Sequence, residues 1–119
     1  MNYENLPVYK STFDLLVQVY RITGNMQREY RFTLAEQLKL QLQKLLVMIY
    51  QANISDDKLK AIGDCRLQLV EVRILFQLAQ ELNQLKDKQA AQLSIKVGDI
   101  SKQLQQWETY FKKQGDHKN

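Results

Sequence analysis

The sequence predicts an all-α protein, an antiparallel up-down-up-down four-helix bundle, because helix breakers are scarce and apolar residues recur at helical intervals. The 119 residues contain one proline and four glycines. Apolar side chains return every three or four positions through most of the chain, as one face of an α-helix requires. A chain of this length fits one domain of about 50–250 residues, so we expect residues 1–119 to form a single domain.

The first helix is expected over about residues 7–24. Pro7 fits its first turn, because the N–H group that proline lacks would have no partner there. Gly24 is a plausible stop, since glycine is common directly after the last turn of a helix. The face predicted to be buried carries large residues at intervals of four, three and four, Tyr9, Phe13, Leu16 and Tyr20, and it is widened by Thr12, Leu15, Val19 and Ile22.

The second helix is expected over about residues 34–52, and a capping box marks its start. The Thr33 hydroxyl would accept the N–H three residues on, and the Glu36 carboxylate would accept the N–H of Thr33. The second half of this helix, residues 45–50, is apolar nearly all round. Because a helix that is apolar on every side is buried on every side, this segment indicates a partner subunit.

Two more helices are expected over about residues 56–85 and 88–113, followed by a polar, frayed tail over 114–119. Residues 55–57 supply an N-cap and first-turn acids for the third helix, and Asp87 is expected to cap the fourth. Residues that share three-and-four spacing across the four helices are predicted to form one core: Tyr9, Phe13, Leu16, Leu38, Leu45, Leu69, Val72, Phe76, Val97, Ile100, Leu104 and Trp107.

The residues that catalytic and metal sites need are nearly absent. His117 is the only histidine and Cys65 the only cysteine, so Ser-His-Asp, Cys-His and zinc-type arrangements lack their members. Cys65 falls in an apolar stripe and is interpreted as a core residue. We therefore expect a protein that is not an enzyme and takes no cofactor.

No apolar segment approaches the roughly 18 residues of a membrane span, and the first residues have no signal core, so a soluble, cytoplasmic protein is expected.

The net charge of +4 and the pI of about 9.2 make the chain mildly basic. Aromatic residues alternate with arginine around residues 20–21 and 30–32, a pattern compatible with base stacking plus phosphate contact. The same residues are compatible with core aromatics beside a solvated, ion-paired face, and the pattern alone does not separate the two interpretations. The candidate nucleic-acid or partner-binding residues are Arg21, Arg28, Arg31, Arg66, Arg73 and Lys102.

Three stretches, taken together and in order, identify a family resemblance. They are Leu6 to Lys10 with Asp14 to Leu16 and Tyr20-Arg21, then Glu29 to Leu38, then Ile100 to Trp107. In this set the chain resembles the bacterial four-helix-bundle family that includes Avd, the accessory variability determinant of diversity-generating retroelements. The family's third helix carries two arginines one turn apart. Arg73 matches the first of them, whereas Gln77 stands at the second.

The resemblance implies a homopentameric barrel with a basic surface that binds RNA and DNA. It also implies a partner, the reverse transcriptase of a retroelement, and a role in the synthesis of mutagenised cDNA. A sister branch of the family is encoded in intervening sequences of ribosomal RNA, so the alternative is a structural or RNA-associated oligomer without a reverse transcriptase partner. A neighbouring reverse transcriptase gene with a template and variable repeat pair would favour the first function.

Overall fold

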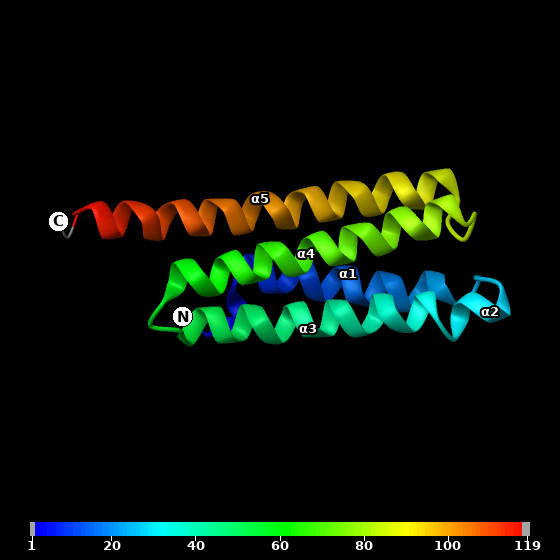
Figure 1. Cartoon of the computed structure of the whole chain (residues 1–119), viewed down its shortest axis with the longest axis horizontal. Helices are drawn as coiled ribbons and strands as arrows, with labels where there is room; N and C mark the ends of the chain where they lie inside the picture. The colour runs from blue at the N-terminus through cyan, green and yellow to red at the C-terminus, as the bar shows by residue number, and fades with distance from the viewer. Residues whose placement is uncertain (1, 118–119) are drawn as a thin grey trace.

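Four long helices run side by side in the part of the chain that the computed structural model describes, residues 2–117. The molecule measures 55 × 21 × 20 Å along its principal axes. Successive long helices run in opposite directions, and each packs against two neighbours in the cyclic order α1, α3, α4, α5 (Figure 1). The elements in chain order are the 3₁₀ helix η1 (Tyr3–Asn5), α1 (Pro7–Thr23), α2 (Arg28–Arg31), α3 (Leu34–Ile54), α4 (Lys58–Glu81) and α5 (Asp87–His117).

Two helix ends form by the local chemistry that the sequence predicts. Pro7 begins α1, and Gly24 follows its last residue with a right-handed φ of −61°, so this glycine ends the helix without a left-handed turn. The Asp57 side chain caps α4 by accepting the backbone N–H of Lys60 at 3.2 Å. This carboxylate satisfies one of the N–H groups that the first turn of a helix leaves without a partner.

The predicted capping box at Thr33 is wrong. The Thr33 hydroxyl instead donates to the backbone carbonyl of Glu29 at 2.8 Å, and Glu36 pairs with Lys39 at 3.3 Å. The reason is α2, a single helical turn that the sequence analysis treated as loop. It places the carbonyl of Glu29 four residues before Thr33, where a threonine hydroxyl readily bonds back to the chain.

Helix α4 ends at Glu81, four residues before the predicted end at residue 85. Asn83 adopts a left-handed φ of 58°, and the N–H groups of Asn83 and Gln84 donate to the carbonyls of Gln80 and Ala79. These two bonds make a Schellman motif, in which asparagine is the usual substitute for glycine. Apolar periodicity continues through Leu82 and Leu85, which is why the pattern alone overran the true end.

Helix α5 is longer than predicted. It extends to His117, so residues 114–117 of the expected tail are helical, while residues 118–119 lie outside the described part of the chain. Gly115 is the sole strong helix breaker in this stretch, and one glycine costs only about 1 kcal/mol relative to alanine. At 1.5 Å per residue the 31 residues of α5 span about 46 Å.

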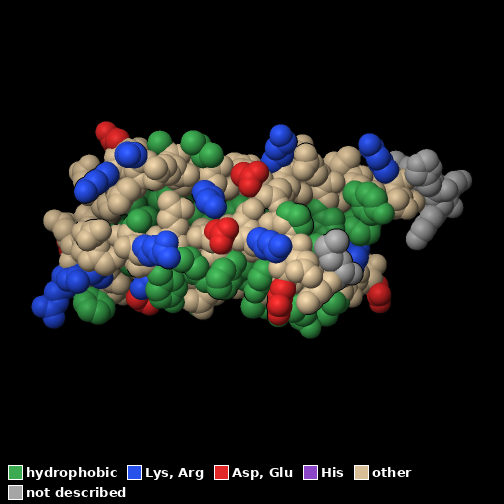
Figure 2. All heavy atoms as spheres, turned by 180° about the vertical axis from the view of Figure 1, so that it is seen from behind, with side chains coloured by type: hydrophobic (Ala, Val, Ile, Leu, Met, Phe, Trp, Pro, Cys, Tyr) green, Lys and Arg blue, Asp and Glu red, His purple; other side chains and the backbone are tan. Residues whose placement is uncertain are grey.

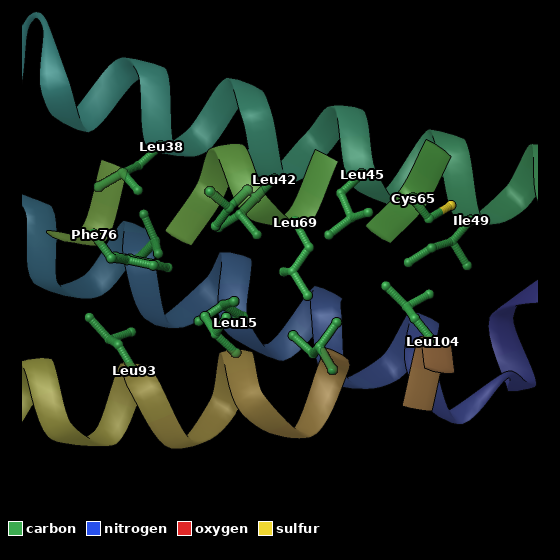
Figure 3. Close-up of a cluster of buried hydrophobic side chains, with 14 of the residues drawn as sticks. Leu15, Leu38, Leu42, Leu45, Ile49, Cys65, Leu69, Phe76, Leu93 and Leu104 are labelled. Atoms are coloured by element: carbon green, nitrogen blue, oxygen red, sulfur yellow. The ribbon is translucent and has the colours of Figure 1, made fainter. Parts of the chain in front are cut away.

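The core lies along the bundle axis and receives side chains from all four long helices (Figure 3). Most of the predicted core residues are buried: Leu38, Leu45, Leu69, Val72, Phe76, Val97, Ile100 and Leu104. Three others, Tyr9, Leu16 and Trp107, are partly buried and pack against the rim of this core. A buried polar side chain joins α3 to α4, since the Gln68 amide donates to the carbonyl and side-chain oxygens of Gln41, both at 2.9 Å.

The predicted buried face of α1 is wrong for two of its aromatic residues. Phe13 is 48% exposed and Tyr20 is also exposed, whereas the core face of α1 consists of Val8, Thr12, Leu15, Val19 and Thr23. The sequence placed Thr12, Leu15 and Val19 correctly but predicted a face wider than the core covers. Thr12 can be buried because its hydroxyl donates to the carbonyl of Val8 at 2.7 Å. Phe13 and Tyr20 are thereby left on the surface.

Two neighbouring apolar residues of α5 provide a test of the bundle. Leu93 is 1% exposed and Ile95 is 73% exposed, although they are two positions apart. We expect Leu93→Ala to lower the free energy of unfolding by about 2–5 kcal/mol, because it leaves a cavity in the core. Ile95→Ala should change it by less than about 0.5 kcal/mol. Urea unfolding followed by circular dichroism measures both, and equal losses would contradict the orientation of α5.

Candidate nucleic-acid interface

A groove runs between α4 and α5 and contains two of the predicted basic residues. One hollow of about 340 Å³ includes Arg66, Arg73 and Ser101 in its lining, and a second of about 360 Å³ runs from Arg73 to Leu85. Arg73 lines both. The groove forms because small residues of α5 face α4 along it: Ala90, Ser94, Gly98 and Ser101.

Arg66 is tied into the wall of this groove. Its guanidinium lies 2.8 Å from the Glu108 carboxylate of α5, and Lys112 lies 3.4 Å from the same carboxylate. The Arg66 side chain is partly buried. The carboxylate of Glu108, which Arg66 shares with Lys112, neutralises part of the Arg66 charge. Arg66 therefore links α4 to α5 and offers less charge to an external anion than an unpaired arginine would.

Arg73 is exposed, and no acidic group among the described residues lies within ion-pairing distance of it. It lies two helical turns from Arg66, and Gln77 follows one turn further on in the same groove. The planar, bidentate guanidinium suits contact with a phosphate group. Of the predicted residues in the groove, Arg73 is thus the one whose charge is available to a ligand.

Three other predicted arginines, Arg21, Arg28 and Arg31, lie at one end of the bundle, where α1 ends and α2 follows. All three are exposed. On the face shown in Figure 2, basic side chains are spread along the molecule, several of them at the end that carries α2, and acidic side chains lie between them. Hydrogen bonds to the α4–α5 connection fix the start of α2, because the Gln27 N–H donates to the Gln84 side chain at 2.8 Å.

Lys102 lies apart from both groups. It is exposed on α5 and lines a separate hollow of about 420 Å³ with Tyr110 and Lys113. The fold therefore distributes the six predicted residues over the α4–α5 groove, the α2 end and the outer side of α5.

Two residues that matter for this arrangement, Gln27 and Gln84, were not singled out by the sequence analysis, because they are 57 positions apart and only the fold brings them together.

Cys65 is fully buried in the core, as the sequence analysis predicted. Burial in an apolar environment raises the pKa of its thiol from 9.0 to about 12, with a smaller contribution from the charge of Asp64. Thiolates are the reactive form of cysteine, so this group is inert at neutral pH. Within residues 2–117 no cluster of three or more His, Cys, Asp or Glu residues could bind a metal ion.

The architecture defines an all-α, four-helix protein. The chain belongs to the bAvd-like family, which matches residues 8–111. Proteins of this family are generally non-catalytic accessory proteins. No curated protein sequence matches the chain. None of the described helices is both long and apolar enough to span a membrane.

The buried thiol leads to a prediction about reactivity and pH. In the folded protein Cys65 should not react with a thiol reagent such as DTNB at pH 8, and it should react fully in urea. Its pKa is higher in the folded than in the unfolded state, so its contribution to stability is complete below pH 9. That contribution is lost as the pH rises from 9 towards 12. Rapid labelling of the native protein would contradict the burial of Cys65, and Cys65→Ser provides the unreactive control.

Proposed function

We propose that this protein is a non-enzymatic accessory subunit of a diversity-generating retroelement. It binds RNA or DNA together with the reverse transcriptase during mutagenic cDNA synthesis. The observation that carries the proposal is membership of the bAvd-like family over residues 8–111. Arg73 in the α4–α5 groove and the arginines of the α2 end support it, because they are exposed, have no ion-pair partner among residues 2–117, and guanidinium groups bind phosphates.

We further propose that the protein works as a ring of five identical subunits, the number that the family resemblance implies. Two surfaces of the chain expose groups of large apolar side chains. One, the α4 surface, consists of Leu59, Leu67, Val70, Ile74 and Leu78. The other, the α1/α3 surface, consists of Phe13, Tyr20, Leu40, Val47, Tyr50 and Ile54. Figure 2 shows a strip of hydrophobic side chains along the face on which α1 lies in front. Contiguous exposed apolar surface of this kind is typical of protein interfaces.

The two surfaces come from different helices, which favours a ring over a two-fold dimer. A two-fold interface uses the same surface on both subunits, whereas a head-to-tail contact joins two different surfaces and closes into a ring when the rotation allows. The α4 surface of one subunit would then cover the α1/α3 surface of the next. A ring would also concentrate charge, since five subunits of net charge +4 give 5 × 4 = +20. Such a field attracts polyanions.

The head-to-tail arrangement predicts how variants behave when mixed. Ile74→Glu damages the α4 surface and Val47→Glu damages the α1/α3 surface, so each variant alone should be a monomer because a charge is buried at its interface. A mixture of the two should form a 1:1 heterodimer, since one intact pair of surfaces remains. Light scattering coupled to size-exclusion chromatography at micromolar concentration measures the masses.

Ile95→Glu is the matched control, because Ile95 is exposed on α5 and belongs to neither surface. It should assemble like the wild type. A wild-type protein that is monomeric at micromolar concentration would overturn the ring. Two variants that assemble only into homodimers would overturn the head-to-tail contact.

Binding of RNA by the groove predicts a specific loss in Arg73→Ala. The wild type should bind a structured RNA with an affinity that falls steeply as salt rises, because each neutralised phosphate releases counterions. The variant should bind more weakly, and its slope of log affinity against log salt should be smaller by about 0.7–0.9, the value for one lost phosphate contact. Helicity and assembly should not change, since an exposed arginine contributes little to folding.

Lys44→Ala is the control for this experiment. Lys44 is exposed on α3, has no ion-pair partner among the described residues, and carries the same charge as Arg73. If both variants lost RNA affinity equally, the loss would come from the lower net charge, and the groove would be excluded as the RNA-binding site. Co-purification with the reverse transcriptase of the same retroelement tests the accessory role itself. Strong RNA binding without capture of a reverse transcriptase would favour the RNA-associated oligomer instead.

A further inference from the structure

A polar hollow of about 600 Å³ opens at the end of the bundle where α2 lies. The α1–α2 and α4–α5 connections and the first turn of α5 form it. Its apolar lining comes from Leu82, which is partly buried, and Leu85, which is buried. Five of its lining residues carry carboxamide side chains: Asn25, Gln27, Asn83, Gln84 and Gln89. Its volume lies within the range of about 300–1,000 Å³ that small-molecule sites usually have.

Three of these amides hold the hollow in shape. The Gln84 amide donates to the Gln27 side chain at 3.1 Å and to the carbonyl of Leu82 at 2.9 Å. The Gln89 side chain accepts the backbone N–H of Lys86 at 3.0 Å. The side chains of Asn25 and Asn83 make no hydrogen bond with any described residue, and both are exposed. Two amides are therefore available to a ligand in a site whose other amides are already ordered.

The charge of the hollow suits a neutral, hydrogen-bonding group better than a phosphate. Lys86 and Asp87 both line it, so its formal charge is balanced. The unbalanced charge lies beside it on α2, where Arg28 and Arg31 are exposed and without an ion-pair partner in the described part of the chain. Phe32, directly after α2, is 71% exposed. A ligand with anionic groups outside the hollow and a flat polar group inside it would match this division.

We infer that this hollow binds an unpaired nucleobase of RNA, while Arg28 and Arg31 contact the adjoining phosphates. An amide offers both a donor and an acceptor and can pair with the edge of a base. The partly exposed Leu82 can contact the face of the ring, and splayed-out bases of single-stranded RNA leave that face open to such a contact. The site therefore prefers unpaired RNA over a duplex, whose bases are stacked and paired. This inference rests on the proposed RNA-binding function and adds a preference to it.

The double variant Asn25→Ala/Asn83→Gly tests the site. It removes the two available amides and breaks none of the hydrogen bonds that shape the hollow. Glycine at position 83 keeps the left-handed φ of 58°, whereas alanine there would strain the backbone. Urea unfolding confirms that the variant is folded. The probe is a single-stranded RNA oligonucleotide of mixed sequence, compared with the same RNA annealed to its complement.

Wild type should bind the single strand more tightly than the duplex. The variant should bind the single strand about tenfold more weakly, as expected for the loss of one or two base-edge contacts. Its affinity for the duplex should not change. The control variant Gln92→Ala/Gln114→Ala removes two exposed amides of α5 that line none of the hollows described above and should bind both probes like wild type.

The outcomes separate this inference from the proposed function. Wild-type RNA binding that the double variant retains in full would overturn the base site and leave the accessory role standing. The absence of RNA binding by wild type at low salt would overturn both. Unchanged RNA binding together with weaker capture of the reverse transcriptase would show that the hollow contacts protein, and would also overturn the inference.

Discussion

Each long helix of this bundle packs mainly against two others, so one chain can bury only part of the circumference of any helix. α1 buries Leu15 and Val19 in the core but leaves Phe13 and Tyr20 exposed. α3 and α4 are apolar over more of their surface than two neighbours can cover, and Val47 and Leu67 remain exposed as a result. The exposed apolar area is therefore a consequence of the fold, and it is the physical basis for the proposed head-to-tail ring.

The same geometry places two polar features beside these apolar surfaces. The α4–α5 groove exists because small α5 residues such as Gly98 and Ser101 leave space beside Arg73. The α2 end exists because two connections, distant in sequence, are joined through Gln27 and Gln84. Leu67 and Val70 of the α4 surface line the same hollow as Arg73, so the proposed subunit contact and the α4–α5 groove adjoin each other.

The hollow at the α2 end shows how a short element gains a fixed shape. α2 is a single turn, too short to be stable alone, since isolated helices need about 12–15 residues. It is ordered by the Gln84 side chain and by Thr33, whose hydroxyl bonds the carbonyl of Glu29. A site that is ordered before the ligand arrives does not spend binding energy on ordering its own loops.

The sequence by itself determined the helix content, the approximate bounds of the four long helices and most of the core, because apolar periodicity is a property of each segment alone. It also determined that Cys65 belongs to the core. Only the tertiary structure decided how much of the wide predicted face of α1 is buried, since Leu15 and Phe13 both lie on that face and the neighbouring helices cover only Leu15. It likewise decided that Arg66 is paired with Glu108 while Arg73 is not. Such pairings depend on distances between helices, which no local pattern contains.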